Sequence, residues 1–248
     1  MLKEERKDQI LAWLKKHRRV LLPELSRHLN VSEDTVRRDI KELSMLKLLK
    51  EVRGGAIPHA PGPREFSERS NFAGRQKMEM AKKAVQLIER GSVIIFDGGT
   101  SAMAVASQLP VDFDLTVLTN SFPVADVLEE RKDVNLLFAG GKLLRESLIT
   151  TGHETIAFFN SMRADICFLG VCSIDLKLGL TGHHYEEAAV KKSMIAASNF
   201  VAALSTTEKI NTAETYSVCP LSSITHLVAP TSAFDLLKPY KKAGITVL

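Results

Sequence analysis

The chain has 248 residues, enough for two domains or for one large domain. Hydrophobic residues make up 45% and charged residues 25%, which is typical of a soluble globular protein. No apolar run reaches the length of a membrane span, and the charged, amphipathic stretch at residues 3–16 is not the pattern expected of a signal peptide. We therefore expect a protein of the reducing cytoplasm with no membrane partner.

The net charge of +4 is unevenly distributed along the chain. Residues 1–60 carry 14 Lys and Arg against 9 Asp and Glu, a net charge of +5, and the remaining residues carry 19 against 20, a net charge of −1. Contacts to nucleic-acid phosphates require such a local positive excess. The excess is small, so it supports a DNA-binding segment at the start of the chain without proving one.

The first 57 residues have the pattern of a winged helix-turn-helix. Residues 4–16 and 22–29 are expected to form two helices, and a tight connection then leads to Ser32, a good N-cap for a third helix that runs to Leu43. Residues 48–57 are expected to form a hairpin, or wing, that turns at Gly54-Gly55. Three short helices with so brief a turn before the third indicate a helix-turn-helix.

The third helix offers two different faces. Val36, Ile40 and Leu43 form one apolar stripe, and Arg38 lies almost opposite it. Such a helix suits the major groove, although an ordinary solvated amphipathic helix would have the same stripe. In the wing, Lys50 and Arg53 are placed to reach phosphate or the minor groove.

These residues also resemble a known family. The stretch VSEDTVRRDIKEL, followed by EVRGGAI, resembles the N-terminal signature of the DeoR-type bacterial transcriptional regulators. The resemblance implies that the Ser, Thr and paired Arg of the third helix face DNA. The expected DNA-binding residues are Ser32, Thr35, Arg37, Arg38, Lys41, Lys50 and Arg53.

A Pro-rich stretch, PHAPGP, marks the end of this region, so we divide the chain into a DNA-binding domain (1–57), a linker (58–75) and a second domain (76–248). In the second domain, near-continuous apolar strands alternate with helices, which predicts an α/β fold with a mostly parallel sheet. Strands are expected at 93–96, 115–118, 134–138, 165–171 and 200–204, with possible edges at 226–229 and 245–248. Helices are expected at 76–90, 102–109, 124–130, 151–162 and 186–198.

Three polar turns follow strands of this domain, which places them at the carboxyl edge of the sheet, where open α/β sheets bind ligands. They are 97–101 (DGGTS), 119–121 (TNS) and 140–142 (GGK). Glycine lets the backbone approach a ligand closely, and free N–H groups at a helix start favour an anion. Glycine also serves tight turns by geometry alone, but three such turns on one edge favour a small molecule that carries phosphate.

Residues 76–230 also resemble the sugar-phosphate sensor domain of the same regulators, through DGGTS, LTVLTNS, LLFAGGKL, ADICFLGV, LGLTGHHYEEAAVKKSMI and the polar turn that ends at Lys209. The resemblance implies a fold similar to ribose-5-phosphate isomerase and a bound phosphorylated sugar. It also implies that Lys191 turns toward the ligand, whereas spacing alone would allow a surface ion pair with Glu187. Three turns depart from the usual family sequences, at 97–101, 207–210 and 229–230, so we expect a retained phosphate pocket and an unusual sugar. The expected ligand-binding residues are Asp97, Gly99, Thr100, Ser101, Thr119, Asn120, Ser121, Gly140, Gly141, Lys142, Glu187, Lys191 and Lys209.

Neither a metal nor another cofactor is expected. Cys167, Cys172 and Cys219 lack the spacing of a zinc site and are expected to be free thiols. His183-His184 beside two glutamates suggests a metal site, but no third ligand is apparent, so a polar loop is favoured.

Two functions compete for this sequence. The first is a DNA-binding regulator, expected to be a repressor of a carbohydrate-catabolism operon. It would bind a double-stranded DNA operator as a dimer or tetramer, under the control of a phosphorylated sugar. The second is a sugar-phosphate isomerase or deaminase-like enzyme with an accessory DNA-binding head, in which Asp97 or Glu187 would act as general base. The head has no purpose in the enzyme, so we favour the regulator.

Overall fold

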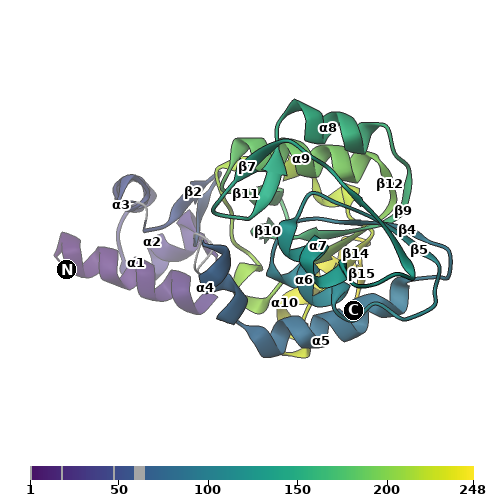
Figure 1. Ribbon diagram of the computed structural model, residues 1–248. Coiled ribbons are helices and arrows are strands. Elements are labelled where there is room, and N and C mark those ends of the chain that lie inside the picture. The colour runs from purple at the N-terminus through teal and green to yellow at the C-terminus, as the bar shows by residue number, and fades with distance from the viewer. Residues whose placement is uncertain (1, 18, 47, 59–64) are drawn as a thin grey trace.

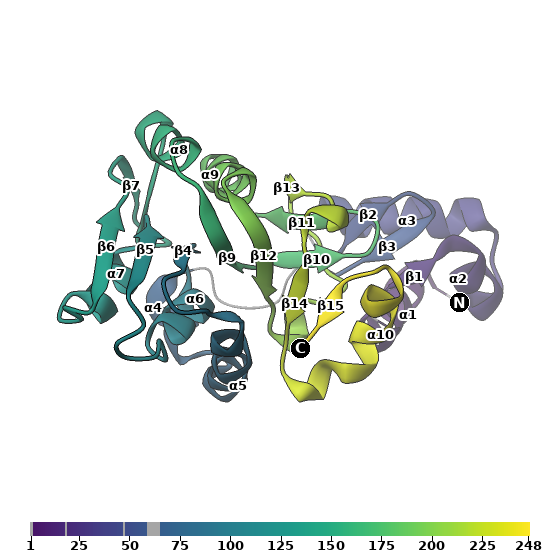
Figure 2. The same ribbon diagram turned by 90° about the vertical axis from the view of Figure 1, so that its right-hand side faces the viewer.

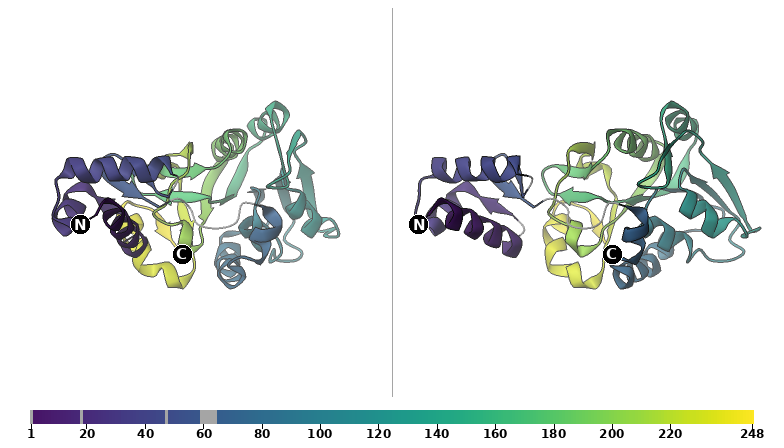
Figure 3. Two further views of the ribbon diagram at one scale, coloured as in Figure 1. Left: turned by 90° about the vertical axis from the view of Figure 1, so that its left-hand side faces the viewer. Right: turned by 60° about the vertical axis from the view of Figure 1, so that its left-hand side comes forward.

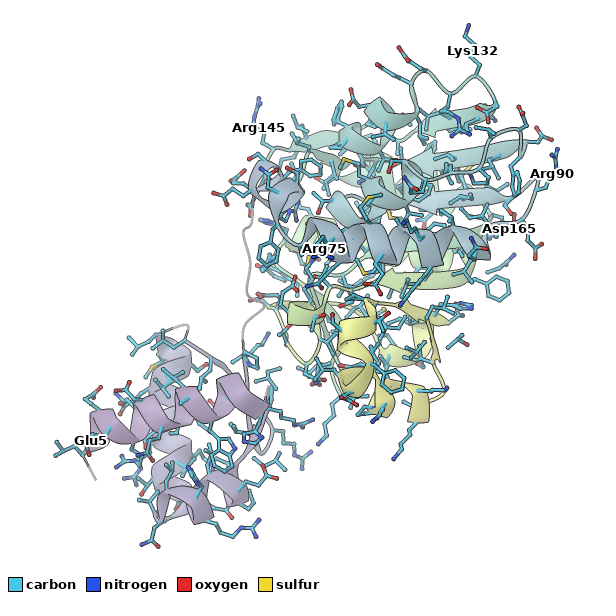
Figure 4. The ribbon with its side chains drawn as sticks, turned by 90° about the horizontal axis from the view of Figure 1, so that it is seen from below. Glu5, Arg75, Arg90, Lys132, Arg145 and Asp165 are labelled. Atoms are coloured by element: carbon cyan, nitrogen blue, oxygen red, sulfur yellow. The ribbon has the colours of Figure 1, made fainter. Side chains whose placement is uncertain are left out.

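The computed structural model describes residues 2–17, 19–46, 48–58 and 65–248. A small N-terminal head extends from one side of a larger α/β domain (Figure 1), and the view from below separates the two parts clearly (Figure 4). No helix in the described ranges is both long and apolar enough to span a membrane.

The head is a winged helix-turn-helix, as the sequence predicts. Its core gathers the apolar stripe of the third helix, including Val36, Ile40 and Leu43, against Ile10 and Leu25 of the other two helices. The wing hairpin is joined by a short third strand in the order β1-β3-β2. The elements of the head are α1 (Lys3–His17), β1 (Val20–Leu21), α2 (Leu22–Leu29), α3 (Glu33–Met45), β2 (Lys50–Val52) and β3 (Gly55–Ile57).

Seven parallel strands form the centre of the larger domain. Their order is β15-β14-β12-β9-β4-β5-β6, and each neighbouring pair is parallel. This confirms the expected α/β class and parallel sheet. The strands are β4 (Val93–Phe96), β5 (Leu115–Thr119), β6 (Val134–Phe138), β9 (Ala164–Gly170), β12 (Ser198–Leu204), β14 (His226–Val228) and β15 (Thr246–Val247).

Helices cover both faces of this sheet (Figure 2). Successive strand residues point to opposite faces, so Ile94 and Phe96 pack in one apolar cluster, with α5, α6 and α7, and Ile95 packs in the other, with α8, α9 and α10. Burial on both faces explains why the strands read as continuous apolar runs. The helices are α5 (Gly74–Ala84), α6 (Thr100–Ala106), α7 (Phe122–Leu128), α8 (His153–Asn160), α9 (Tyr185–Ala196) and α10 (Phe234–Lys242).

Several smaller elements were not expected from the sequence. A hairpin of β7 (Lys142–Leu144) and β8 (Ile149–Thr151) follows β6, and a separate antiparallel sheet joins β10 (Ser173–Asp175), β11 (Gly179–Gly182) and β13 (Tyr216–Cys219). Helix α4 (Phe66–Asn71) lies within the segment expected to be a linker. The division into residues 1–57, 58–75 and 76–248 stays a prediction.

The expected helices of this domain differ from the observed ones by a few residues at their ends, and the structure explains the difference for two of them. The helix expected at 151–162 begins only at His153, because Thr151 ends β8 and Gly152, with φ of +104°, lies between them. The helix expected at 76–90 ends at Ala84 and continues as a 3-10 turn through Leu87. Both errors lie at element ends, where sequence patterns are weakest.

Candidate functional site

The candidate ligand site lies where the strand order of the sheet reverses. From β4 the chain proceeds through β5 and β6 to one edge, then returns to β9 on the other side of β4 and continues through β12, β14 and β15. Open α/β sheets bind ligands in the crevice at the carboxyl ends of such a pair of strands. In this chain the corresponding position lies after Phe96 of β4 and Gly170 of β9.

A buried ion pair occupies this position. The ammonium of Lys191, on α9, donates to Asp97 Oδ2, which also accepts from the backbone N–H of Gly170 at 2.9 Å. The same ammonium donates to the carbonyl of Gly170 at 2.9 Å. A side chain at Gly170 would not fit, because a Cβ there would lie 2.7 Å from the carbonyl oxygen of Gly98 and 3.0 Å from Asp97 Oδ2. Gly170 is therefore a site residue that the sequence analysis missed.

Glu187 completes this cluster from the same helix as Lys191. Its Oε1 lies 3.4 Å from Lys191 Nζ, and the two residues are only 7% and 3% exposed, which excludes the surface ion pair that their spacing would allow. Burial disfavours the charged form of Lys191, but Asp97 and then Glu187 outweigh this cost and raise the pKa of the ammonium. Lys191 is thus a fixed cation at neutral pH.

A second lysine reaches the carboxyl end of β9 from the loop after β12. Lys209 Nζ donates to the carbonyl of Val171, the residue after β9, at 2.8 Å. The same loop is held against α5, since the backbone N–H of Thr207 donates to Gln76 Oε1 at 3.0 Å. Burial lowers the pKa of Lys209, and the nearby cations Arg69 and Lys191 lower it further against the opposing effect of Cys172 and Glu208. The structure therefore brings Asp97, Glu187, Lys191 and Lys209 together, as a shared site requires.

Two further cations approach this loop, and neither was expected from the sequence. Lys77, on α5, is 5% exposed and donates its ammonium to the carbonyls of Arg69 and Phe72. Arg69, on α4, has two guanidinium nitrogens, Nε and Nη2, that are buried. Lys77 does carry a sequence signal, because it falls three residues before Met80 on the apolar stripe of its helix.

The 119–121 turn instead makes contacts within the fold. Thr119 Oγ1 donates to the carbonyl of Phe96 at 2.8 Å, and Ser121 Oγ caps α7 by accepting from the N–H of Val124 at 3.4 Å. Asn120 Nδ2 donates to the carbonyl of Thr150 in β8 at 2.6 Å, but its Oδ1 is buried without a hydrogen-bond partner. This oxygen is the one buried side-chain atom of the turn without a hydrogen-bond partner among the described residues, and a ligand role for the turn stays a prediction.

The 97–101 and 140–142 turns are also shaped by the unexpected hairpin. A Cβ at Gly98 would lie 2.2 Å from Cγ2 of Ile149, and one at Gly141 would lie 2.6 Å from the carbonyl oxygen of Thr151. Lys142, by contrast, is exposed and pairs with Glu186 at 2.9 Å. Gly99 adopts φ of +109° immediately before the buried Thr100 and Ser101, and the carbonyl of Gly140 accepts from Thr155 Oγ1 at 2.7 Å.

On the head, the predicted face of α3 is exposed. Ser32 caps the helix, since its Oγ accepts from the N–H of Thr35 at 3.2 Å. Arg37, Arg38 and Lys41 are exposed, and Arg37 Nη1 lies 2.5 Å from Asp34 Oδ1. The helix thus offers these cations to a partner.

The two wing cations differ in their surroundings. Arg53 is exposed, whereas the ammonium of Lys50 donates to the carbonyl of Glu214 in the larger domain. The wing lies against this domain (Figure 3), where Val52 and Arg53 line a groove together with Asp175 and Leu178. Lys50 is therefore engaged within the protein in this arrangement.

His183 and His184 pair with different glutamates, and the three cysteines are free thiols. His183 Nδ1 lies 3.1 Å from Glu214 Oε2, and His184 Nε2 lies 3.1 Å from Glu146 Oε2. Within the described residues, no group of three or more His, Cys, Asp or Glu side chains is placed to hold a metal. The three cysteines are free, and burial raises the pKa of each thiol, that of Cys219 to about 11.

Comparison with known proteins matches both parts of the chain. Residues 6–59 match the DeoR-like helix-turn-helix domain, and residues 73–230 match the DeoR C-terminal sensor domain. The chain belongs to the DeoR family of transcriptional regulators. The regulator hypothesis is thereby confirmed over the enzyme hypothesis, because both halves match domains of regulators.

Named relatives of this DeoR-family chain include repressors. It is 33% identical to the HTH-type transcriptional repressor GlcR of Bacillus subtilis, over 96% of this chain and 93% of that protein. It is 31% identical to the glycerol-3-phosphate regulon repressor of Escherichia coli, over 81% of this chain and 80% of that protein. Among solved structures, a ribose 5-phosphate isomerase from Methanocaldococcus jannaschii aligns with a TM-score of 0.39 and 17% identity, over 54% of this chain and 52% of that one.

Proposed function

We propose that this DeoR-family chain is a repressor of a carbohydrate-catabolism operon, and that a phosphorylated sugar controls its affinity for DNA. The head binds the operator through α3 and the wing, and the sugar phosphate binds at the carboxyl ends of β4, β9 and β12. The names of the GlcR and glycerol-3-phosphate regulon repressors support this reading. We place the protein in the cytoplasm, with its operator.

The buried cluster at the strand reversal carries the ligand part of this proposal. Lys191 and Lys209 come from different elements, and both side chains donate to backbone carbonyls at the carboxyl end of β9. Such preorganised cations suit an anionic group, and the carboxylates of Asp97 and Glu187 suit the hydroxyl groups of a sugar. A phosphorylated sugar carries both kinds of group.

We further propose that the protein acts as a dimer or tetramer. One helix-turn-helix head makes few contacts, and two heads on a two-fold operator double them. The exposed face of α3, with Arg37, Arg38 and Lys41, is the surface that we assign to DNA.

Ligand screening followed by operator binding tests the proposed function. Phosphorylated sugars and their unphosphorylated parents would be screened by thermal shift, because a ligand that binds the folded state raises its stability by mass action. We expect stabilisation by phosphorylated compounds only. Each binder would then be added to a complex with the operator DNA, and a binder that leaves operator affinity unchanged would contradict the proposal.

A further inference from the structure

Helix α4 brings a half-buried arginine, Arg69, to the edge of the ligand site, and two of its guanidinium nitrogens are fully buried. The Nε and Nη2 atoms of Arg69 are buried and have no hydrogen-bond partner among the described residues. Its guanidinium lies 5.9 Å from the centre of the Phe66 ring, a contact that leaves the N–H groups free. Because arginine stays charged at every physiological pH, these are buried, charged donors without acceptors, which folded proteins avoid unless a ligand supplies the acceptor.

The charged neighbours of Arg69 are mainly other cations. Burial lowers the pKa of both Lys77 and Lys209, and electrostatic repulsion by the positive charge of Arg69 lowers each further. The pKa of Lys77 is lowered to about 8, by burial first and then by Lys209. Cations that repel one another in a buried place gain from an added anion, which would relieve burial and repulsion together.

The carboxylates close to this group are already engaged. Glu187 attracts Arg69 electrostatically but has its ion pair with Lys191. Glu208 accepts a hydrogen bond from the hydroxyl of Thr206. A purely structural arginine would form a bidentate ion pair with one of these carboxylates. The half-buried Arg6 does this with the buried Asp39, through Nε at 2.5 Å and Nη2 at 3.0 Å.

We infer that Arg69 is a ligand-binding residue of the sensor site, whose Nε and Nη2 donate side by side to the phosphate group of the effector. Lys209 lies beside it and Lys77 adds its charge to the same group. The inference rests on the proposed function, and it identifies the part of the effector that this side of the site recognises, a phosphomonoester dianion. It also places a ligand contact on α4, within the segment that joins the head to the sensor domain.

The test uses the full chain and four proteins: wild type, Arg69→Leu, Arg69→Lys and Arg75→Leu. Arg75 is an exposed arginine on the same helix as Lys77 (Figure 4), so its replacement removes one positive charge without touching the site. Affinity for inorganic phosphate and for glucose 6-phosphate would be measured by calorimetry at constant ionic strength, with glucose and sodium chloride as blanks. The two anions separate recognition of phosphate alone from recognition of a phosphorylated sugar.

We expect Arg69→Leu to weaken the binding of whichever anion the wild type binds by about tenfold or more, since hydrogen bonds to charged groups are the strong ones. Arg69→Lys keeps the charge but loses the paired guanidinium donors, so its affinity should lie between those of the wild type and Arg69→Leu. Arg75→Leu should bind like the wild type. Arg69→Leu should also melt no lower than the wild type in phosphate-free buffer, because it removes an unpaired buried charge.

Equal anion affinity in folded Arg69→Leu, Arg75→Leu and wild type would overturn the assignment, as would a wild type that binds neither anion. Should Arg69→Leu fail to fold, the comparison of Arg69→Lys with the wild type decides in the same way. A further outcome is that Arg69→Leu loses anion binding while the operator affinity of the wild type is unchanged by the bound anion. That result would support the assignment of Arg69 and contradict the proposed function instead.

Discussion

The side chain of Lys50, in the wing, donates a hydrogen bond to the backbone carbonyl of Glu214, in the sensor domain. Glu214 lies five residues after Lys209, on the loop that leads away from the ligand site, and Thr212 of this loop donates to the carbonyl of Lys209 at 2.7 Å. The wing and the candidate ligand site thus contact the same loop. A change at Lys209 can reach the head through five residues of chain and the hydrogen bond between Glu214 and Lys50.

This contact separates the two wing cations in their expected effect on DNA. Arg53 is exposed, so Arg53→Ala should weaken binding to all sequences alike and reduce the slope of log affinity against log salt by about one. Lys50→Ala should reduce the slope less, because its ammonium is held by Glu214 and burial lowers its pKa. Operator titrations at several salt concentrations measure both slopes. Equal losses in the two variants would mean that the wing leaves Glu214 when DNA binds.

Arg38 is expected to read bases. It is exposed on α3, opposite the buried stripe, so Arg38→Ala should cost about 1–3 kcal/mol of operator binding and relax base preference at one position. Fluorescence anisotropy with the operator and with single-base variants measures both effects. Arg145→Ala, an exposed arginine of the sensor domain (Figure 4), serves as the control. Unchanged affinity and specificity in a folded Arg38→Ala would remove this residue from the interface.

The head shows how much of this molecule could be predicted from its sequence. The cap at Ser32, the stripe of α3 and the Gly54-Gly55 turn are local features, and all three are present. The parallel strands were equally predictable, because burial on both faces demands continuous apolar residues. Strands β7, β8, β10 and β11 were missed, since three or four residues are too few to show a period and no Gly-Gly turn joins them, as one joins the equally short β2 and β3. Helix α10 was missed because Pro239 lies inside it.

The candidate site was less predictable than the fold. Its strand-end residues followed from the position of each turn, but the ion pair of Lys191 with Asp97 joins residues 94 positions apart. The need for glycine at position 170 arises from a close approach to Gly98 and Asp97 that no local pattern records. Arg69 lies in a polar stretch that was predicted to be a linker. Only the burial of its Nε and Nη2 atoms in the folded chain distinguishes it from a surface arginine.

The Lys191–Asp97 pair should respond to mutation as a buried pair does. Lys191→Ala leaves the carboxylates of Asp97 and Glu187 buried without their cation, so it should cost about 3–5 kcal/mol of stability. The double variant Lys191→Met with Asp97→Asn should recover part of this loss. Urea unfolding measures both. A Lys191→Ala protein as stable as the wild type would mean that the pair is open to water.

Gly170→Ala tests the close packing at the end of β9. The added methyl would push apart the carbonyl of Gly98 and the carboxylate of Asp97, at a cost of about 1–3 kcal/mol. We therefore expect lower stability and weaker binding of a sugar phosphate, with operator binding by the ligand-free protein retained. Gly74→Ala, where a Cβ would meet nothing within 4 Å, is the matched control. If the two variants behave alike, the packing at Gly170 has no part in the site.

The pKa of Lys77 predicts a rise in stability with pH. Burial and the cations Lys209 and Arg69 lower it from 10.5 to about 8, against the opposing effect of Glu208. Between pH values of about 8 and 10.5 the unfolded chain binds one more proton at this residue than the folded chain. The free-energy cost of burying the Lys77 ammonium therefore decreases, and the protein becomes more stable, as the pH rises through that window. Lys77→Met should remove this part of the pH dependence, as measured by urea unfolding from pH 7 to 10. An unchanged slope would show that Lys77 titrates normally.

We propose that ligand binding and DNA binding are linked, and a pair of reciprocal titrations measures this linkage. Operator affinity would be measured with and without a saturating sugar phosphate, and the affinity for that sugar phosphate with and without saturating operator. Linkage is reciprocal, so we predict that both affinities change by the same factor, about 5- to 150-fold. A sugar phosphate that binds the sensor domain but leaves operator affinity unchanged would contradict the account.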